Sequence, residues 1–289
     1  MLDIDWVKIP EGEVLLGLSD EQRETLHKKI WASYGVDNLD PVDRAAIESL
    51  AMRHRQGAHY KLEGLTREER RVLPNPNDDR MDYFYAEGVL GHIPQQEHVW
   101  LPSFYIARYP ITHAQASEFF RDSKRARLFR PGYNVPNMPE EFHVLAAIEM
   151  IDWLGARFPT TLEWEKVACG IDGRIYPWGN EWDASRCNLT SRDYRPEFSR
   201  KNGFRHTVVD AYPKGVSSYG VWDMVGNVCE WVRKPSADNS KVTDADQLTV
   251  KGESPETVHT PEFVWALPAR THGSGFNRAG DGEIGLRPV

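Results

Sequence analysis

The sequence has few cysteines, no long apolar run and no basic block, and each shortage excludes a class of protein. Three cysteines among 289 residues share no CxxC spacing, which is typical of reduced thiols in a cytosolic protein rather than a disulfide framework. No apolar run reaches about 18 residues and no signal-peptide segment follows Met1, so we expect a cytoplasmic chain that does not span a membrane. No Lys/Arg block is interleaved with aromatics and the formal net charge is −8, so we expect neither a nucleic-acid nor a membrane partner.

The residues that are abundant predict an irregular fold. The chain has 22 glycines, 19 prolines and 10 tryptophans, and this mix favours loops and short strands packed on aromatic rings. The segment 6–17 alternates loosely and predicts a first strand or hairpin. Residues of about 20–95 are charged and poor in glycine, and we expect a helical insertion there within a single domain over 1–289. Local signals predict where its helices begin: the capping boxes Ser19–Gln22 and Thr66–Glu69, and Asp40 as N-cap before Pro41.

The second half of the chain predicts three further helices and then mostly loops. "THAQASEFFRDS", "PEEFHVLAAIEMIDWLGA" and "PTTLEWEKVACG" are helical in pattern, the last with Thr160 and Glu163 as a capping box and Gly170 as its end. Brief strands are expected near 208–212, 228–232 and 284–287. The polar stretch 234–262 is expected to be a long surface loop.

Two carboxylates stand out in "YGVWDMVGNVCEWV", residues 219–232. Asp223 and Glu230 lie among apolar residues, and a buried carboxylate costs several kcal/mol unless it is paired or holds a metal. Without a metal, Asp223 would cap a turn and Glu230 would pair with Arg233 or Arg287. The residues alone leave both interpretations open.

Five motifs occur in an order that resembles one known family. They are "IPEGEVLLG", "LPSFYIARYPITHAQASEFF", "RFPTTLEWEKVACGIDGRIYPWGNEWD", "VVDAYPKGVSSYGVWDMVGNVCEWV" and the closing "IGLRPV", and together they cover roughly 6–19 and 97–289. This set resembles the formylglycine-generating enzyme, or sulfatase-modifying factor, family. The resemblance implies an α+β chain with the compact, irregular C-type-lectin-like fold of that family, low in regular secondary structure.

The resemblance also implies calcium as a cofactor. The first family site maps onto the carboxylates of Asp223 and Glu230 and the carbonyls of Gly226 and Val228, and calcium accepts such mixed oxygen ligands. The second family site maps onto other residues, with side chains of Asn188 and Asn202 and carbonyls of Leu189 and Phe204. The family usually has Asp where this chain has Asn202, which predicts weaker binding at the second site.

The catalytic chemistry of the family is not expected here. Formylglycine synthesis uses a pair of cysteines in the C-terminal region, and the corresponding segment, "ARTHGSGFNRAGDGEIGLRPV", has none. Cys229 is interpreted as a small buried side chain and Cys169 as a core or helix-end residue, and the resemblance implies that Cys187 occurs in family members that use other residues for catalysis. None of the three has a neighbouring His or basic cluster in the sequence that would lower its pKa. The histidines His27, His54, His59, His92 and His98 are interpreted as scattered surface residues. The alternative is a metal-dependent oxidoreductase of the wider family, with a site assembled from distant His and Cys residues.

The favoured interpretation is therefore a non-catalytic module that binds a protein or a small molecule. Its recognition surface is expected in 265–282, "WALPARTHGSGFNRAGDG", where aromatic anchors stand among short polar side chains and glycines. The expected contact residues are Trp265, Arg270, His272, Ser274, Phe276 and Asn277. The resemblance allows one special subtype, the hypervariable ligand-binding proteins of diversity-generating retroelements, whose variable positions lie in this region.

Overall fold

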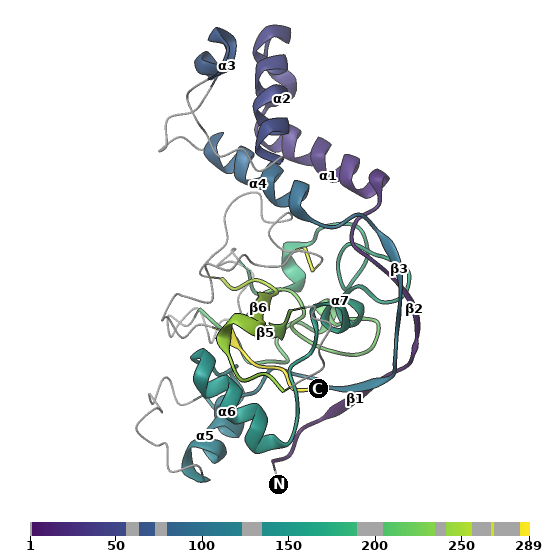
Figure 1. The fold of residues 1–289 in the computed structure, drawn as a ribbon, viewed down its shortest axis with the longest axis vertical. Coiled ribbons are helices and arrows are strands. Elements are labelled where there is room, and N and C mark those ends of the chain that lie inside the picture. Colours follow the sequence, from purple (N-terminus) through teal and green to yellow (C-terminus); the bar gives the residue numbers. More distant parts are fainter. Residues whose placement is uncertain are drawn as a thin grey trace. The chain divides into compact units, whose positions relative to one another are not determined.

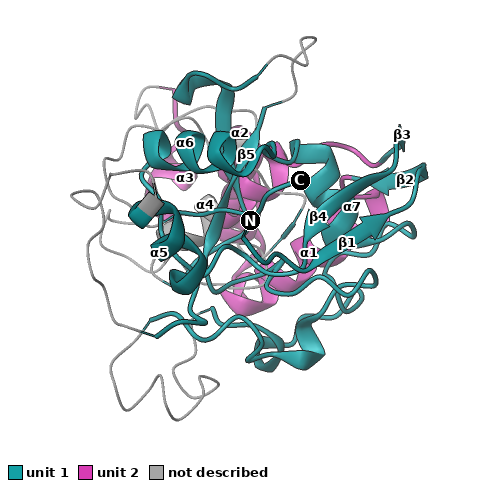
Figure 2. Ribbon diagram, turned by 90° about the horizontal axis from the view of Figure 1, so that it is seen from below, with its two compact units in different colours: residues 1–16, 97–258, 266–289 teal, residues 17–96, 259–265 magenta. Residues whose placement is uncertain are grey.

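A long antiparallel ribbon runs along one side of the main unit of the protein in this computed structural model (Figure 1). The structure describes residues 2–55, 64–72, 80–122, 135–189, 205–234, 241–255, 267–268 and 284–289. The chain forms two compact units, one of 1–16, 97–258 and 266–289 and the other of 17–96 and 259–265 (Figure 2). The insertion expected at about 20–95 falls within the second unit.

The ribbon of the first unit is divided into two short sheets by prolines. β1 (Trp6–Ile9) pairs with β4 (Phe104–Ala107), and β2 (Gly12–Leu16) pairs with β3 (Glu97–Leu101). Ile9 lies opposite Phe104 and Gly12 opposite Leu101, so the register is unchanged across the interruption. Pro10 and Pro102 stand in the interruption, where a missing N–H prevents a continuous ladder. Figure 1 shows the ribbon turning between β1 and β2.

A three-stranded sheet lies at the centre of the same unit. β5 (Cys229–Arg233) is its middle strand, antiparallel to β6 (Leu248–Lys251) and parallel to β7 (Ile284–Gly285). All four residues of β6 are buried, so the prediction of a surface loop over 234–262 is wrong for this segment. The reason is that Lys251, whose charge locally favours a surface position, is neutralised inside the protein by Glu165 at 2.8 Å.

Helices pack beside this sheet and supply most of the core. α5 (His113–Asp122), α6 (Val144–Leu154) and the sheet share one apolar cluster that includes Phe119, Met150 and Leu286. α7 (Thr161–Cys169) packs with β1 and β4 in a second cluster centred on Trp164. In the described part of the unit, the other regular elements are 3₁₀ turns: η3 (Ala184–Arg186), η5 (Pro213–Gly215) and η6 (Ala245–Gln247).

Local signals set several helix ends as expected. The Thr160–Glu163 capping box is present at the start of α7, and Gly170 ends that helix with φ +70°. The predicted helix over 139–156 begins only at Val144, because Pro139 to His143 form an extended segment before it. The strand predicted near 228–232 is β5, whereas 208–212 forms turns and no strand.

The second unit is helical. Its elements are α1 (Asp20–Ser33), η1 (Val36–Asn38), α2 (Pro41–Arg55), α3 (Arg67–Val72) and α4 (Arg80–His92). The Ser19–Gln22 and Thr66–Glu69 capping boxes are both formed, and the Asp40 side chain accepts from the Val42 amide at 2.9 Å. Leu26, Ile30, Ile47, Leu50 and Leu90 are among its buried apolar residues. In the described part of the chain, none of the helices combines the length and the apolar character that crossing a membrane requires.

Candidate functional site

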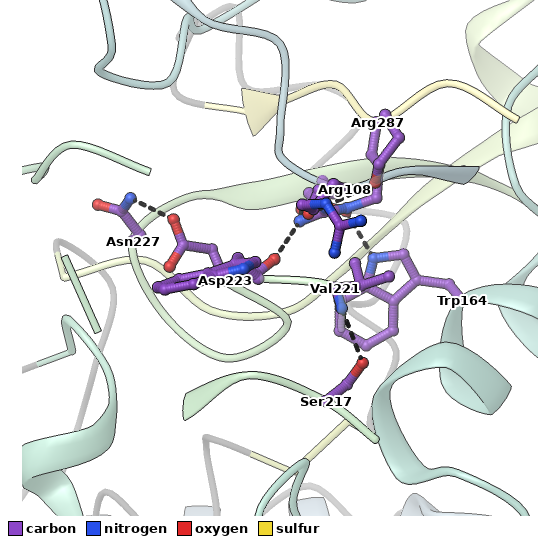
Figure 3. Close-up of polar contacts among 10 residues, drawn as sticks. Arg108, Trp164, Ser217, Val221, Asp223, Asn227 and Arg287 are labelled. Atoms are coloured by element: carbon purple, nitrogen blue, oxygen red, sulfur yellow. Dashed lines mark hydrogen bonds and ion pairs between the residues drawn. The ribbon is translucent and has the colours of Figure 1, made fainter. Parts of the chain in front are cut away.

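The Glu230 carboxylate is held by an arginine that follows the C-terminal strand β7 (Ile284–Gly285). β5 places Glu230 at the centre of the sheet, where the side chains of Glu230 and Arg287 are both 0% exposed. The Arg287 guanidinium donates to both carboxylate oxygens, with Nη2 to Oε1 at 2.6 Å and Nε to Oε2 at 2.9 Å. Trp164 Nε1 donates to Oε2 at 2.7 Å (Figure 3). Of the two partners that the sequence left open for Glu230, Arg287 is the one that the structure shows.

Arg287 also ties three separate segments of the chain together. Its Nη1 donates to the carbonyls of Ala107 at 3.0 Å and Arg108 at 2.9 Å, and its Nη2 donates to the carbonyl of Trp222 at 2.8 Å. A guanidinium offers five N–H donors in a rigid fork, and a buried one is stable only when these are satisfied. Arg287 therefore joins the end of β4, the loop before β5 and β5 itself.

The loop that leads into β5 is strained and polar. Asp223, Gly226 and Asn227 all have positive φ, at +54°, +78° and +68°. Asn227 Nδ2 donates to Asp223 Oδ2 at 2.8 Å and to the carbonyl of Thr207 at 3.2 Å (Figure 3). Burial raises the pKa of Asp223 to about 7 despite this bond. Asp223 is thus held by a neutral amide, whereas Glu230 is held by a cation.

Asn188 is bonded directly to this loop. Its carbonyl accepts from the Asn227 amide at 2.7 Å, and its Nδ2 donates to the Arg205 carbonyl at 2.8 Å and to Asn227 Oδ1 at 3.1 Å. A Cβ on Gly226 would lie 2.5 Å from the Asn188 carbonyl oxygen, so glycine is required there. Asn188 is only 2% exposed, and among the residues that the structure describes its buried Oδ1 has no hydrogen-bond partner. Asn188, a member of the second predicted calcium set, therefore lies next to the loop that carries the first set.

The two sets differ in how well they fit calcium. Glu230 receives four N–H contacts from Arg287 and Trp164, which fill the acceptor positions of its carboxylate. The Gly226 carbonyl already accepts from the Val228 amide at 2.9 Å. The set Asp223, Gly226, Val228 and Glu230 does not fit calcium in this arrangement. Asn188 Oδ1 does fit as a ligand, because it is a buried oxygen that lacks a donor.

The other predicted ligands have not been placed. Asn202 and Phe204 lie outside the described residues, whereas Leu189 is buried beside Asn188. Within the described ranges, no group of three His, Cys, Asp or Glu side chains converges as a metal site would require.

The predicted recognition residues also lie outside the described residues. These are Trp265, Arg270, His272, Ser274, Phe276 and Asn277. The structure does describe both ends of that segment. Lys251 Nζ donates to the Pro268 carbonyl at 2.9 Å and to Glu165 Oε2 at 2.8 Å, and β7 begins at Ile284. Local sequence reasoning missed the Lys251–Glu165 pair, since its partners are 86 residues apart.

Cysteines and histidines are placed in ordinary structural surroundings where the structure describes them. Cys169, Cys187 and Cys229 are all buried and unbridged, and burial raises the pKa of the Cys169 thiol. His98 is exposed, as expected for a scattered surface residue, and His92 Nδ1 contacts the Gly88 carbonyl at 2.6 Å. His27 differs from the expectation, because its Nδ1 lies 2.5 Å from the fully buried carboxylate of Glu87.

Comparison with solved structures defines the class of protein. The structure of CarF aligns over 100% of this chain and 98% of its own, with a TM-score of 0.53 and 15% sequence identity. The fold is the irregular α+β, C-type-lectin-like fold of the sulfatase-modifying factors, as the motifs predicted.

The family follows from the sequence comparison. The family model of the sulfatase-modifying factor enzyme 1-like domain matches residues 79–287, more than half of the chain, and the chain belongs to this family. The inactive Cα-formylglycine-generating enzyme 2 of Bos taurus is 38% identical over 105 residues, 35% of this chain and 33% of that protein. The hercynine oxygenase of Mycolicibacterium smegmatis is 31% identical over 173 residues, 47% of this chain and 38% of that protein. The chain thus spans about a third of the length of these curated relatives.

Proposed function

We propose that the chain is a binding module that recognises a protein or a small molecule through residues 265–282. The observation that carries the proposal is the way both ends of residues 269–283 are held. Lys251, which is 1% exposed, fixes the Pro268 carbonyl at the start, and β7 and Arg287 fix the chain after the end. A recognition loop on a rigid support loses less conformational entropy on binding than a free one, so this arrangement favours recognition.

The surroundings of the cysteines support a non-catalytic role. A redox-active or metal-binding cysteine acts as a thiolate, which an apolar environment disfavours. Cys169, Cys187 and Cys229 are all buried, and the raised pKa of Cys169 favours its neutral thiol. The similarity to an inactive relative from Bos taurus agrees with this proposal.

Site-specific photocrosslinking tests the proposal without a known ligand. A photoreactive phenylalanine analogue would replace Phe276 in one variant and Ile171 in another, because Ile171 is 65% exposed in the same unit. After irradiation in the native host, we expect a discrete adduct from position 276 and none of that size from position 171. Equal adducts at both positions, or no adduct at 276 in folded protein, would refute recognition by this segment.

The retroelement subtype is a narrower proposal on the same segment. If the chain is a hypervariable ligand-binding protein, variation among copies of its gene within one population should concentrate in 265–282. Deep sequencing of the gene tests this directly. Variation spread evenly over 97–289 would contradict the subtype and leave the binding module intact.

We further propose calcium as a structural cofactor at Asn188 and the Leu189 carbonyl, with Asn202 and Phe204 completing the site. The support is the buried Asn188 Oδ1, which lacks a donor. A hard cation would supply the positive charge that this oxygen lacks, and it would fasten the segment around 188 to the loop at Gly226. Elemental analysis of purified protein for calcium, iron and copper tests this assignment.

The same elemental analysis distinguishes the binding module from the second candidate function. The similarity to hercynine oxygenase favours a metal-dependent oxidoreductase as the second candidate function. Such an enzyme would carry iron or copper at a stoichiometry near one. Calcium alone supports the binding module, whereas stoichiometric iron or copper would overturn it.

A further inference from the structure

The extended segment 135–142 is a junction between three parts of the first unit. His113 and Ala114, at the start of α5, donate their amides to the carbonyls of Met138 and Pro136 at 2.9 and 3.0 Å. Glu140 N also donates to the carbonyl of Ile111, just before α5. Two further bonds reach other segments: Val209 N donates to the Asn137 carbonyl, and Phe142 N donates to the carbonyl of Ile284 in β7. Loosening of 135–142 would therefore break hydrogen bonds to α5, to residue 209 and to β7.

Glu140 lies in the middle of this junction and is largely buried. Its side chain is 15% exposed, and its Oε2 lies 4.0 Å from Nε2 of His113, the first residue of α5. The neighbouring Glu141 has a different partner, with its Oε1 3.3 Å from His206 Nε2. Among the ionisable side chains that the structure describes, His113 is the one within ion-pairing distance of Glu140, and it can compensate the carboxylate only while it is protonated.

We propose that Glu140 and His113 form a proton-dependent latch, which holds 135–142 against the start of α5 and loosens as pH rises through neutrality. A protonated Glu140 is neutral and tolerates burial, and an ionised Glu140 is tolerated while His113 is protonated. Once both groups have lost their protons, a carboxylate remains buried without a cation, and opening of the segment lets water solvate it.

The energetics of burial agree with this geometry. Burial raises the pKa of Glu140 to about 7. A carboxyl with a raised pKa binds its proton more tightly in the folded state, so its contribution to stability is complete below its ordinary value of 4.5. That contribution is lost progressively as pH rises towards 7, by at most about tenfold in the opening equilibrium per pH unit. The loss therefore spans the range from about pH 4.5 to about pH 7 and levels off above the folded-state pKa.

Hydrogen exchange at pH 6 and pH 8 tests the latch. After correction for the intrinsic exchange rate, peptides covering 135–142 should lose up to about tenfold in protection at pH 8 in the wild type. Glu140→Gln should remove this difference, because the amide does not titrate. Glu141→Gln is the matched control, and it should behave as the wild type does.

A carboxyl titration keeps the proposal testable if Glu140→Gln does not fold. In the wild type, the ¹³C resonance of the Glu140 carboxyl should titrate with a midpoint near 7, and His113→Gln should move the midpoint upward by removing the nearby cation. A wild-type midpoint below 5 would overturn the proposal. So would equal protection at pH 6 and pH 8, or a pH difference that persists unchanged in Glu140→Gln.

Discussion

Replacement of Arg287 by methionine tests the central claim that a buried cation, and not a metal ion, holds Glu230. The substitution keeps much of the side-chain volume and removes the charge and every donor. It leaves the Glu230 carboxylate buried with Trp164 Nε1 as its remaining donor, and it frees the carbonyls of Ala107, Arg108 and Trp222. Breaking one side of a fully buried ion pair costs about 3–5 kcal/mol, and we expect a loss in that range.

The assay is urea unfolding followed by circular dichroism, arranged as a double-mutant cycle. Arg287→Met, Glu230→Gln and the double variant are compared, and the double variant should lose clearly less than the sum of the two single losses. The expected coupling is roughly 1–3 kcal/mol, as for residues in one buried network. Lys241→Met is the control, because the Lys241–Asp152 pair is exposed on both sides, at 63% and 60%. It should change stability by no more than about 0.5 kcal/mol.

Two results would refute the reasoning. One is a loss below about 1 kcal/mol for Arg287→Met, which would mean that the ion pair contributes little to the fold. The other concerns a chelator. If Glu230→Gln abolished the effect of EGTA on the melting temperature, Glu230 would be a calcium ligand. We expect instead that Glu230→Gln lowers the melting temperature equally with and without EGTA.

Three further predictions follow from contacts of the same unit. In urea unfolding, Gly226→Ala should lower the free energy of unfolding more than Gly155→Ala does. Both glycines have positive φ, but of the two only Gly226 would bring a Cβ against backbone, 2.5 Å from the Asn188 carbonyl oxygen. Equal losses of stability would show that the backbone strain of positive φ alone matters. Leu286→Ala should cost about 2–5 kcal/mol as a core truncation, whereas Phe276→Ala should stay near wild-type stability; a comparable loss for Phe276→Ala would place that residue in the core. Calcium at 100 times its Kd should stabilise the wild type by about 2.7 kcal/mol, and Asn188→Ala should reduce this gain; an unchanged gain would remove Asn188 from the site.

Features with local causes were predictable from the sequence. The capping boxes at Ser19–Gln22 and Thr160–Glu163 are complete within four residues, and both formed as expected. The family resemblance rests on motifs in order, and the family model confirms it over 79–287. The strand at β5 was found to within one residue, because its apolar run begins directly after a glycine-containing loop.

Features that depend on distant partners were not predictable. The charge of Lys251 favoured the prediction of a surface loop over 234–262, because nothing near Lys251 in the sequence shows that Glu165 neutralises this lysine. The sequence named Arg233 and Arg287 as equal candidates for Glu230, and only the parallel pairing of β5 with β7 decides between them. The unpartnered oxygen of Asn188 likewise depends on the approach of Gly226 and Asn227, about 40 residues later in the chain.

The two buried ion pairs have a common place in the architecture, and this place connects the fold to the proposed function. Glu230 and Lys251 lie opposite each other on β5 and β6, yet each pairs elsewhere, with Arg287 and Glu165. Trp164 stands between the pairs, since its Nε1 donates to Glu230 and its ring lies 5.9 Å from Lys251 Nζ. One pair fixes the start of residues 269–283 through Pro268, and the other fixes the strand that follows them. The residues of both ion pairs lie outside 269–283, so substitutions within the segment proposed for recognition leave the paired residues themselves unchanged.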